Sequence, residues 1–248
     1  MQLKNISTLP PKDMEKEFIK EDTEILLEKI REYQRIMYAQ KKYSILIIFQ
    51  AMDAAGKDGA VKDIFSGINP LGCRVFWRKA PTEIELDHDF LRRIHKSTPE
   101  KWMIHIFNRS HYEDILVPHV EWMLPKDIIE KRYTHVNNFE QLLADNNTHV
   151  LKFYLHISRE EQKERLEERL QNPQKFRKHN DNDRESRKKR DEYTETYEQI
   201  FNNCTVTPRH VIPADKNRWK VHQIAQIIVS EFEKMDLQRP GLETEKFD

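Results

Sequence analysis

An unbroken apolar segment at residues 44–49 constrains the fold more than any other feature of this sequence. It reads Ser44-Ile-Leu-Ile-Ile-Phe49, and a continuous apolar run of this length is typical of a strand buried on both faces of a parallel sheet. Further apolar runs follow at spacings that leave room for helices, at residues 75–77, 103–107, 150–157 and 210–212. Strands that alternate with helices predict an α/β fold, an open parallel β-sheet with helices on both faces.

The helices are predicted from apolar residues at helical spacing. We expect them at residues 21–40, 59–66, 84–95, 137–145, 159–170 and 219–235. Ser158 and Glu161 have the spacing of a capping box, which would open the helix at 159–170. Residues 1–20 are polar and contain two adjacent prolines, so we expect an extended lead-in there.

Composition limits the classes of function. The 248 residues fit one α/β domain, and Lys plus Arg equals Asp plus Glu at 42 each. A chain without net charge is not expected to bind polyanions over its whole surface, so any anion site must be a local concentration of charge. The first residues lack the apolar run of a signal peptide, and no apolar segment approaches about 18 residues, so we expect a cytoplasmic protein with no membrane partner.

Metal or disulfide chemistry based on cysteine and histidine finds little support. Cys73 and Cys204 are too few for a disulfide scaffold, and their spacing matches no metal motif. Asp87-His88-Asp89 is interpreted as a helix cap rather than a zinc site, because no further Cys or His lies at ligand spacing.

A Gly-Lys loop directly follows the first predicted strand. Strand, loop, Gly56-Lys57 and helix is the order that a P-loop requires, and backbone N–H groups at a helix N-terminus favour a phosphate. The usual pattern has a first Gly where Ala51 stands and a hydroxyl where Asp58 stands. A carboxylate must therefore replace the hydroxyl as magnesium ligand, and Asp53 and Asp58 are the candidates. The alternative is an ordinary βα turn that contains Gly-Lys.

A second polar cluster follows the strand predicted at 103–107. Because ligands bind at the carboxyl ends of parallel strands, residues 108–113 should lie beside the Gly-Lys loop. Arg109 could clamp a phosphate in bidentate fashion, and Glu113 could contribute to magnesium binding. Asn108 stands where P-loop enzymes have an acid. The alternative is a surface loop with a solvated Arg and Glu.

Residues 172–190 break the α/β pattern, since they carry dense charge and one aromatic residue. Such a segment cannot bury a core face, and we predict a mobile insertion between helices. It could bind a linear polyanion by charge alone, or it could be a solvated helical face balanced by neighbouring acids. Its cations are Lys175, Arg177, Lys178, Arg184, Arg187, Lys188, Lys189 and Arg190.

Several motifs occur in an order that points to a known family. They are Ala51-Met-Asp-Ala-Ala-Gly-Lys-Asp-Gly59, Asn69-Pro70, Lys79-Ala-Pro81, Asp87-His-Asp89, Phe107-Asn-Arg-Ser-His-Tyr-Glu113, Val136-Asn-Asn-Phe-Glu140, Leu151-Lys-Phe153 and Val211-Ile-Pro-Ala-Asp215. With these motifs the sequence resembles polyphosphate kinase family 2 over about residues 40–235. Asn108 resembles the class III branch, because other classes carry Asp there.

The resemblance implies a P-loop kinase fold like that of thymidylate kinase, with a helical lid. The expected divisions are an N-terminal extension and helix at 1–42, a core at 43–240 with a lid insertion at about 172–192, and a tail at 241–248. The implied reaction is Mg²⁺-dependent, reversible phosphoryl transfer between inorganic polyphosphate and AMP or ADP. Mn²⁺ is an alternative cation, and adenine or guanine nucleotides are the expected partners, with no nucleic acid.

The resemblance also assigns residues and an assembly. Asp53, Lys57, Arg109 and Glu113 would be catalytic, with Asp53 and Glu113 holding the metal. The phosphate- or nucleotide-binding residues would be Ala54, Ala55, Gly56, Asp58, Gly59, Asn108 and Arg132. Lys178 and Arg187 match lid positions that bind polyphosphate, and a homo-oligomer, a dimer or tetramer, is implied.

Two features depart from the family pattern and keep other functions open. The family's lid aromatics are replaced by charges at Arg177-Lys178-His179 and Arg190, and an Ala-Pro-Trp becomes Thr207-Pro208-Arg209. Nucleotide preference and lid closure could change with them. The alternatives are an NTP-dependent nucleoside monophosphate kinase, with the same fold and loop, and a non-catalytic protein that binds polyphosphate or nucleic acid.

Overall fold

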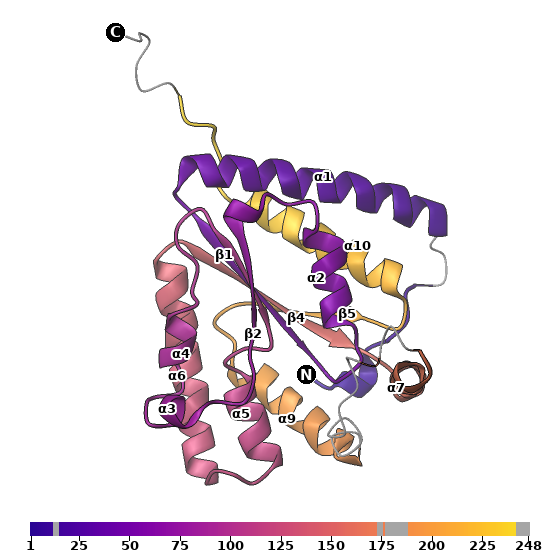
Figure 1. Cartoon of the computed structure of the whole chain (residues 1–248), viewed down its shortest axis with the longest axis vertical. Helices are drawn as coiled ribbons and strands as arrows, with labels where there is room; N and C mark the ends of the chain where they lie inside the picture. The colour runs from indigo at the N-terminus through magenta and orange to yellow at the C-terminus, as the bar shows by residue number, and fades with distance from the viewer. Residues whose placement is uncertain (12–14, 173–175, 177–187, 242–248) are drawn as a thin grey trace.

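The computed structural model describes residues 1–11, 15–172, 176 and 188–241. Five parallel strands form one open sheet in the order β2-β3-β1-β4-β5 (Figure 1). The strands are β1 (Ser44–Ala51), β2 (Cys73–Trp77), β3 (Ile104–Asn108), β4 (Thr148–His156) and β5 (Arg209–Pro213). All five predicted strands are therefore confirmed, each with ends shifted by one or two residues.

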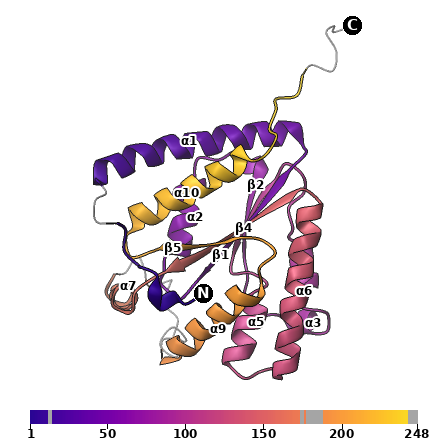
Figure 2. The same cartoon turned by 180° about the vertical axis from the view of Figure 1, so that it is seen from behind.

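Helices cover both faces of the sheet, as predicted (Figures 1 and 2). On one face lie α1 (Lys16–Gln40), α2 (Lys57–Phe65) and α10 (Asn217–Glu233). On the other face lie α5 (Glu113–Val120), α6 (Lys126–Asp145) and α9 (Arg190–Asn203). Shorter or peripheral elements are η1 (Leu3–Asn5), η2 (Pro70–Gly72), α3 (Glu83–Leu86), α4 (Arg92–His95) and α7 (Arg159–Gln171).

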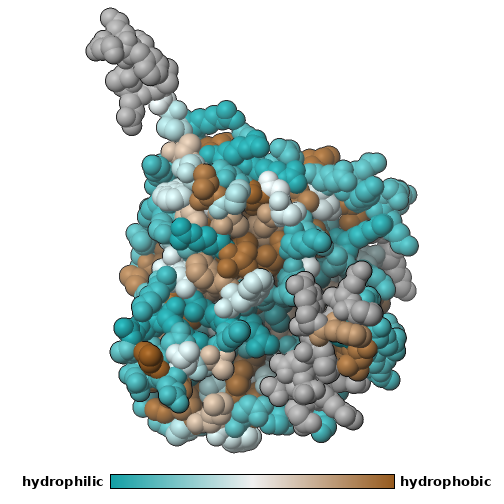
Figure 3. All heavy atoms as spheres, viewed as in Figure 1, coloured by the Kyte–Doolittle hydropathy of each residue, from teal (hydrophilic) through white to brown (hydrophobic). Residues whose placement is uncertain are grey.

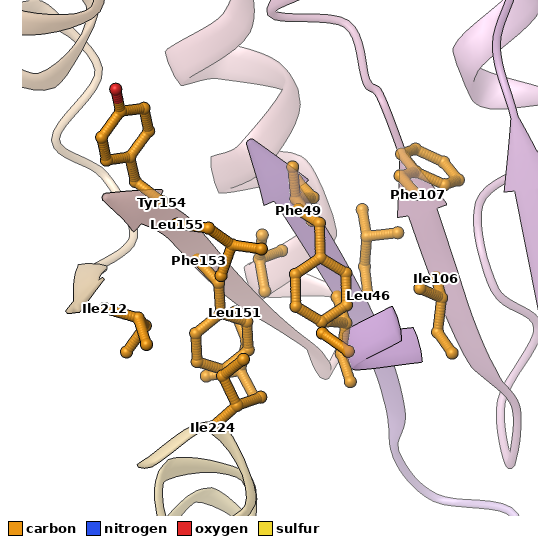
Figure 4. Close-up of a cluster of buried hydrophobic side chains, with 14 of the residues drawn as sticks. Leu46, Phe49, Ile106, Phe107, Leu151, Phe153, Tyr154, Leu155, Ile212 and Ile224 are labelled. Carbon is orange, nitrogen blue, oxygen red and sulfur yellow. The ribbon is translucent and has the colours of Figure 1, made fainter. Parts of the chain in front are cut away.

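The core forms where the two helical layers meet the sheet. All eight residues of β1 are buried, as expected for a central parallel strand. Successive side chains of β4 point to opposite faces (Figure 4). Phe153 stacks on Phe49 with ring centroids 5.5 Å apart, whereas Tyr154 packs against Tyr197 and Phe201 of α9. The alternating side chains of β4 thus contribute to the core on both faces of the sheet.

Strand β2 is the less protected edge of the sheet. Val75 and Trp77 are exposed, and Figure 3 shows apolar side chains gathered in the middle of the face where Figure 1 places β2. This exposure explains why the apolar pattern of β2 is the weakest of the five strands in the sequence.

The single helix predicted at 84–95 is wrong, because the chain forms the separate helices α3 and α4. The interruption comes from Asp89, whose Oδ1 accepts hydrogen bonds from the N–H groups of Leu91 and Arg92, both at 3.0 Å. An Asp that bonds to nearby backbone N–H groups competes with helix continuation. Within Asp87-His88-Asp89, Asp89 thus bonds to the N–H groups at the start of α4, while Asp87 is the C-cap of α3.

Two helices, α5 and α9, were not predicted, and α6 begins 11 residues before the predicted start at 137. Helix α5 contains Pro118 in its interior, and proline argues against a helix in a pattern-based prediction. Helix α9 begins inside the charged segment, where the composition conceals it. The predicted helices at 21–40, 59–66, 159–170 and 219–235 are confirmed with small shifts of their ends.

The extended lead-in predicted for residues 1–20 is wrong in part. Helix α1 begins at Lys16, and η1 places Leu3 in the core. Thr8 then donates to the carboxylate of Asp215 at 2.7 Å. The segment is held because its apolar and polar groups both find partners in the second half of the chain.

The predicted capping box at Ser158 is half formed. The Ser158 hydroxyl accepts the N–H of Glu161 at 3.1 Å. The N–H of Ser158 donates to Asp215 at 2.9 Å, while the Glu161 carboxylate pairs with Arg165. Asp215 thus takes the role that the capping-box pattern gives to Glu161.

Across the part of the chain that the structure describes, no helix combines the length and apolar character that crossing a bilayer requires.

Candidate functional site

The predicted site residues meet at the carboxyl ends of β1 and β3. The chain leaves β1 through α2 on one face of the sheet and leaves β3 through α5 on the other. This is the topological switch point of the sheet, the place where ligands bind in open α/β folds. The loops touch across it: Asn108 donates to Asp58 Oδ1 at 2.7 Å, and Arg109 lies 3.4 Å from Asp53. As the parallel-sheet argument predicts, residues 108–113 lie beside the Gly-Lys loop.

The backbone of the Gly-Lys loop (residues 52–57) adopts a shape that suits an anion. Ala54 and Gly56 have φ values of 64° and 90°, in the left-handed region. Gly56 is the N-cap of α2 and provides no capping side chain. The first N–H groups of the helix lack intrahelical acceptors, so they remain available to an anion at the helix end. A Cβ atom added at Gly59, in the first turn of α2, would meet nothing within 4 Å.

Lys57 stands at the centre of the charged groups. Its ammonium donates to the Ala51 carbonyl at 3.0 Å, and the hydroxyl of Tyr197 donates to the same oxygen at 3.3 Å. Burial lowers the pKa of Lys57, while the nearby carboxylates of Asp53 and Glu113 act in the opposite direction. Lys57 therefore lies within the field of both predicted metal ligands.

Arg109 and Glu113 complete this centre. Arg109 has a φ of 71°, an uncommon conformation for a residue with a side chain and one that clusters at functional sites. Glu113 is the first residue of α5. Burial raises the pKa of Glu113, and the charges of Arg109 and Lys57 oppose that increase. Glu113 is partly exposed, and its carboxyl lies within the field of both cations.

Asp53 and Glu113 are oxygen donors of the kind that magnesium prefers. Mg²⁺ sites commonly use one or two carboxylates and complete the coordination with water and substrate phosphates. Within the described residues, no group of three or more His, Cys, Asp or Glu side chains could hold a metal unaided. Two carboxylates fit a Mg²⁺ site of this kind, in which water and a substrate phosphate would provide the remaining ligands.

The two candidate acids of the loop have different partners. One oxygen of Asp58 accepts the amide of Asn108, so this carboxylate links α2 to the end of β3. Asp53 instead faces Arg109, and its backbone carbonyl is held by the side chain of Gln162 at 3.0 Å. The Asp53 carboxylate is thus paired with a guanidinium, whereas Asp58 accepts a hydrogen bond from a neutral amide.

Arg132 has a structural partner at some distance from the loop. Pro118 in α5 has no N–H and so cannot donate to the carbonyl of Asp114, four residues earlier. Arg132 donates to that carbonyl instead and lies over the Phe90 ring, 4.6 Å from its centroid. It lines a pocket of about 500 Å³ between α4 and α6. Arg132 is joined to the site through Asp114, the neighbour of Glu113.

Three side chains that the sequence patterns did not identify hold the Gly-Lys loop by donating hydrogen bonds to backbone carbonyl oxygens. Arg165 on α7 donates to the carbonyls of Ala54 at 3.3 Å and Ala55 at 3.2 Å. Lys220 on α10 donates to the carbonyl of Gly56 at 3.1 Å. Tyr197 completes the set by donating to the carbonyl of Ala51, the last residue of β1 and the one that precedes the loop. Lys220 could have been found, because helical spacing places it on the apolar stripe of α10; Arg165 and Tyr197 give no comparable signal.

The charged segment is only partly described. Lys178 and Arg187, the predicted lid residues, lie outside the described residues. Arg190 is buried, and its guanidinium donates to Gln162 and to the carbonyl of Ile157 at 2.6 Å. Lys189 pairs with Glu121. Arg190 therefore does not belong to a solvent-facing basic run, since its charge supports the junction of α9 and α7.

One cluster of motif residues lies in the core rather than at the site. Glu140 and Lys152 are buried and paired at 2.7 Å, and Thr207 donates to the same carboxylate at 2.8 Å. Burial opposes ionisation of Glu140, but His111 and Lys152 lower its pKa to about 2. This group, the Glu140–Lys152 network, joins α6 to β4.

The chain is similar to one described family along most of its length. Polyphosphate kinase 2 (PPK2) matches residues 13–240. The AMP/ADP-polyphosphate phosphotransferase of Meiothermus ruber is 43% identical over 222 residues, covering 89% of this chain and 83% of that protein. The ADP-polyphosphate phosphotransferase of Rhodopseudomonas palustris is 37% identical over 228 residues, covering 86% and 79%. The crystal structure of polyphosphate kinase 2 from Arthrobacter aurescens TC1 matches with a TM-score of 0.95 at 31% identity, covering 99% of this chain and 90% of that chain.

Proposed function

Because this chain belongs to the polyphosphate kinase 2 family, we propose that it transfers phosphoryl groups reversibly between inorganic polyphosphate and AMP or ADP, with Mg²⁺. The observation that carries the proposal is the convergence of Lys57 and Arg109 with the carboxylates of Asp53 and Glu113 at one strand edge. Two cations and two acids around one helix N-terminus suit a reaction in which a charged phosphoryl group moves between oxygen atoms.

The chain's own groups account for binding and charge neutralisation. The N–H groups at the start of α2 would bind the phosphate, and Lys57 would exchange its bond to the Ala51 carbonyl for the transferred group. Arg109 would hold a neighbouring phosphate through its planar guanidinium. Phosphoryl transfer needs little covalent chemistry from the protein, so positioning and preorganised charge supply most of the acceleration.

Asp53 and Glu113 would hold the magnesium ion. When bound, the ion neutralises phosphate oxygens that the two cationic side chains do not reach. The raised pKa of Glu113 fits this role, because a bound cation stabilises the ionised carboxylate that burial disfavours.

The relatives' names support the choice of acceptor. One relative acts on AMP and ADP and another on ADP, by their names, and neither name mentions guanine. We propose adenine nucleotides as the acceptors and keep guanine nucleotides as a separate arm of the assay. Homo-oligomer formation, implied by the family resemblance, is a prediction that the mass of the purified protein in solution would test.

The decisive assay supplies polyphosphate, Mg²⁺ and AMP or ADP without any NTP, and follows ADP and ATP by chromatography. We expect both products, loss of turnover with a magnesium chelator, and consumption of ATP when polyphosphate and ATP are supplied together. If ATP but not polyphosphate phosphorylates AMP, the protein is an NTP-dependent nucleoside monophosphate kinase.

A non-catalytic polyphosphate-binding protein is the other outcome of the same assay. Asn108 keeps this alternative in view, since an amide stands where P-loop enzymes carry an acid. This alternative requires tight binding of polyphosphate with no turnover for any nucleotide or direction. Turnover that disappears in Lys57→Ala would exclude it.

A further inference from the structure

Lys220 is a buried lysine in an unusual place. It lies on α10, and its ammonium donates to the carbonyl of Gly56 at 3.1 Å and reaches that of Ala55 at 3.5 Å. The Gly56 carbonyl also accepts the N–H of Ala60 at 3.1 Å, the first hydrogen bond of α2. A Cβ atom on Gly56 would lie 2.5 Å from the Lys220 ammonium. Lys220 therefore lies directly against the backbone of the loop.

The charge of Lys220 is not ion-paired to any acidic side chain among the described residues. The charged groups that act on it are Arg165 on α7 and, more weakly, Asp63 on α2. Burial lowers the pKa of Lys220 to about 8, with Arg165 acting in the same direction and Asp63 against it. Burying a charge in this way is costly unless something else compensates for it.

Peptide geometry shows what such a charge does to the loop. In a trans peptide the carbonyl and the following N–H point in opposite directions. Lys220 draws the carbonyls of Ala55 and Gly56 to its own side, so the N–H groups of Gly56 and Lys57 are directed to the other. Arg165 supports the same arrangement by donating to the carbonyls of Ala54 and Ala55.

We propose that Lys220 is a positioning residue for phosphate: it fixes the peptides of the Gly-Lys loop so that their N–H groups face the bound anion. Its buried charge also favours an anion on the opposite side of these two peptides. The inference rests on the proposed function only in taking this loop as the phosphate site. It does not depend on which nucleotide accepts the phosphoryl group.

The first test compares binding of inorganic tripolyphosphate, without nucleotide, to the wild type and to Lys220→Met by isothermal titration calorimetry at pH 7. Methionine keeps the length of the side chain and removes the donor. We expect the dissociation constant to rise about 10-fold, less than the roughly 100-fold loss expected for a donor that touches the reacting group. Lys234→Met is the matched control, because Lys234 is exposed at the far end of α10 and should bind as the wild type does.

The pH dependence separates positioning from a merely structural role. In the wild type, tripolyphosphate binding should weaken as the pH rises through about 8, where Lys220 loses its proton. Lys57 and the phosphates contribute to the pH dependence of binding in every variant. The difference between the wild-type and variant pH profiles therefore reports the contribution of Lys220. Lys220→Met should lack this loss, and Lys220→Arg, which stays charged, should keep its affinity at pH 9.

Steady-state kinetics gives a further distinction. Lys220→Met should raise the KM for polyphosphate and leave the KM for the nucleotide unchanged. Equal wild-type and Lys220→Met profiles in folded proteins would overturn the inference. If Lys220→Met does not fold, Lys220→Arg decides: loss of affinity at pH 9 equal to that of the wild type would contradict it. Lys220-dependent binding without any phosphoryl transfer would instead overturn the proposed function and leave the inference standing.

Discussion

Lys152 and Lys220 are both completely buried, yet their surroundings differ. Lys152 donates to the carboxylate of Glu140 at 2.7 Å and to the hydroxyl of Tyr112 at 3.2 Å. Lys220 donates only to main-chain carbonyls among the described residues, and these belong to the loop proposed to bind phosphate. Lys152 belongs to a buried network in which its charge is neutralised by Glu140. Lys220 carries a charge without an ion-paired carboxylate among the described residues, beside the proposed site.

The difference teaches how the role of a buried charge can be recognised. A buried ion pair is neutral as a unit, and removing one partner exposes the full desolvation cost of the other. A buried cation without a carboxylate costs stability in the free protein, and such a cost is common where a site is prepared for a ligand. Removing a lysine from a buried ion pair should therefore reduce stability. Removing a buried lysine that has no carboxylate should instead reduce function.

The largest expected effect comes from Lys152→Met. The variant leaves the carboxylate of Glu140 buried without its cation, and we expect a loss of about 3–5 kcal/mol in the free energy of unfolding, measured by urea denaturation at pH 7. The double variant Lys152→Met/Glu140→Gln removes both charges and should recover much of this loss. If the single variant loses less than about 1 kcal/mol in the free energy of unfolding, Lys152 does not stabilise the fold as proposed, and the contrast with Lys220 fails.

The same network predicts acid sensitivity. The folded-state pKa of Glu140 is about 2, below its ordinary value of 4.5. Its contribution to stability is therefore complete above pH 4.5 and is lost as the pH falls through about 2. The Lys152→Met/Glu140→Gln variant should show a shallower loss of stability than the wild type between these values.

Lys57→Ala should abolish most activity with little effect on folding. Losing one preorganised charge at the reacting phosphate lowers turnover by about 100-fold or more, equivalent to roughly 2.7 kcal/mol. Turnover with polyphosphate and AMP measures the first quantity, and thermal unfolding measures the second. Near-normal turnover would show that the Gly-Lys loop is an ordinary βα turn.

Lys220→Met should raise stability at pH 7 rather than lower it. Its charged form is disfavoured by burial, and replacing such a charge with an apolar group is neutral or stabilising, here by about 1–2 kcal/mol. The penalty is fully present below the folded pKa of about 8 and disappears as the pH rises toward 10.5. The advantage of the variant in urea denaturation should therefore shrink between these two values. If Lys220→Met instead loses as much stability as Lys152→Met, both lysines stabilise the fold and the contrast between them is wrong.

Tyr197→Phe should have the smallest effect. It removes the Tyr197 hydroxyl, a side-chain donor to the Ala51 carbonyl, and leaves the Lys57 ammonium, another such donor, in place. We expect a loss of about 0.5–1.5 kcal/mol in stability, the contribution of one hydrogen bond, and a few-fold decrease in turnover. Tyr193→Phe, one turn earlier on α9, is the matched control and should change neither quantity by as much.

Local patterns determined much of the fold. Continuous apolar runs predict all five strands, and their alternation with helices predicts the parallel sheet. Periodicity misses the splitting of the helix at 84–95, because Asp89 acts through individual hydrogen bonds. It misses α5 because the helix contains Pro118, which a pattern takes as evidence against a helix. The charge pattern places Arg190 in a basic lid, whereas a buried partner, Gln162, decides its position.

The sequence by itself determined where the proposed site lies: a buried strand must be followed by its loop and helix, and the ends of parallel strands must share one edge. Those two constraints are enough to bring Asp53, Lys57, Arg109 and Glu113 together. Only the tertiary structure decided what holds the loop. Lys220 and Gly56 are 164 residues apart in the chain, and local spacing reveals that a lysine is buried but not what it contacts. Its partners follow from how α10 packs against α2, which depends on the fold as a whole.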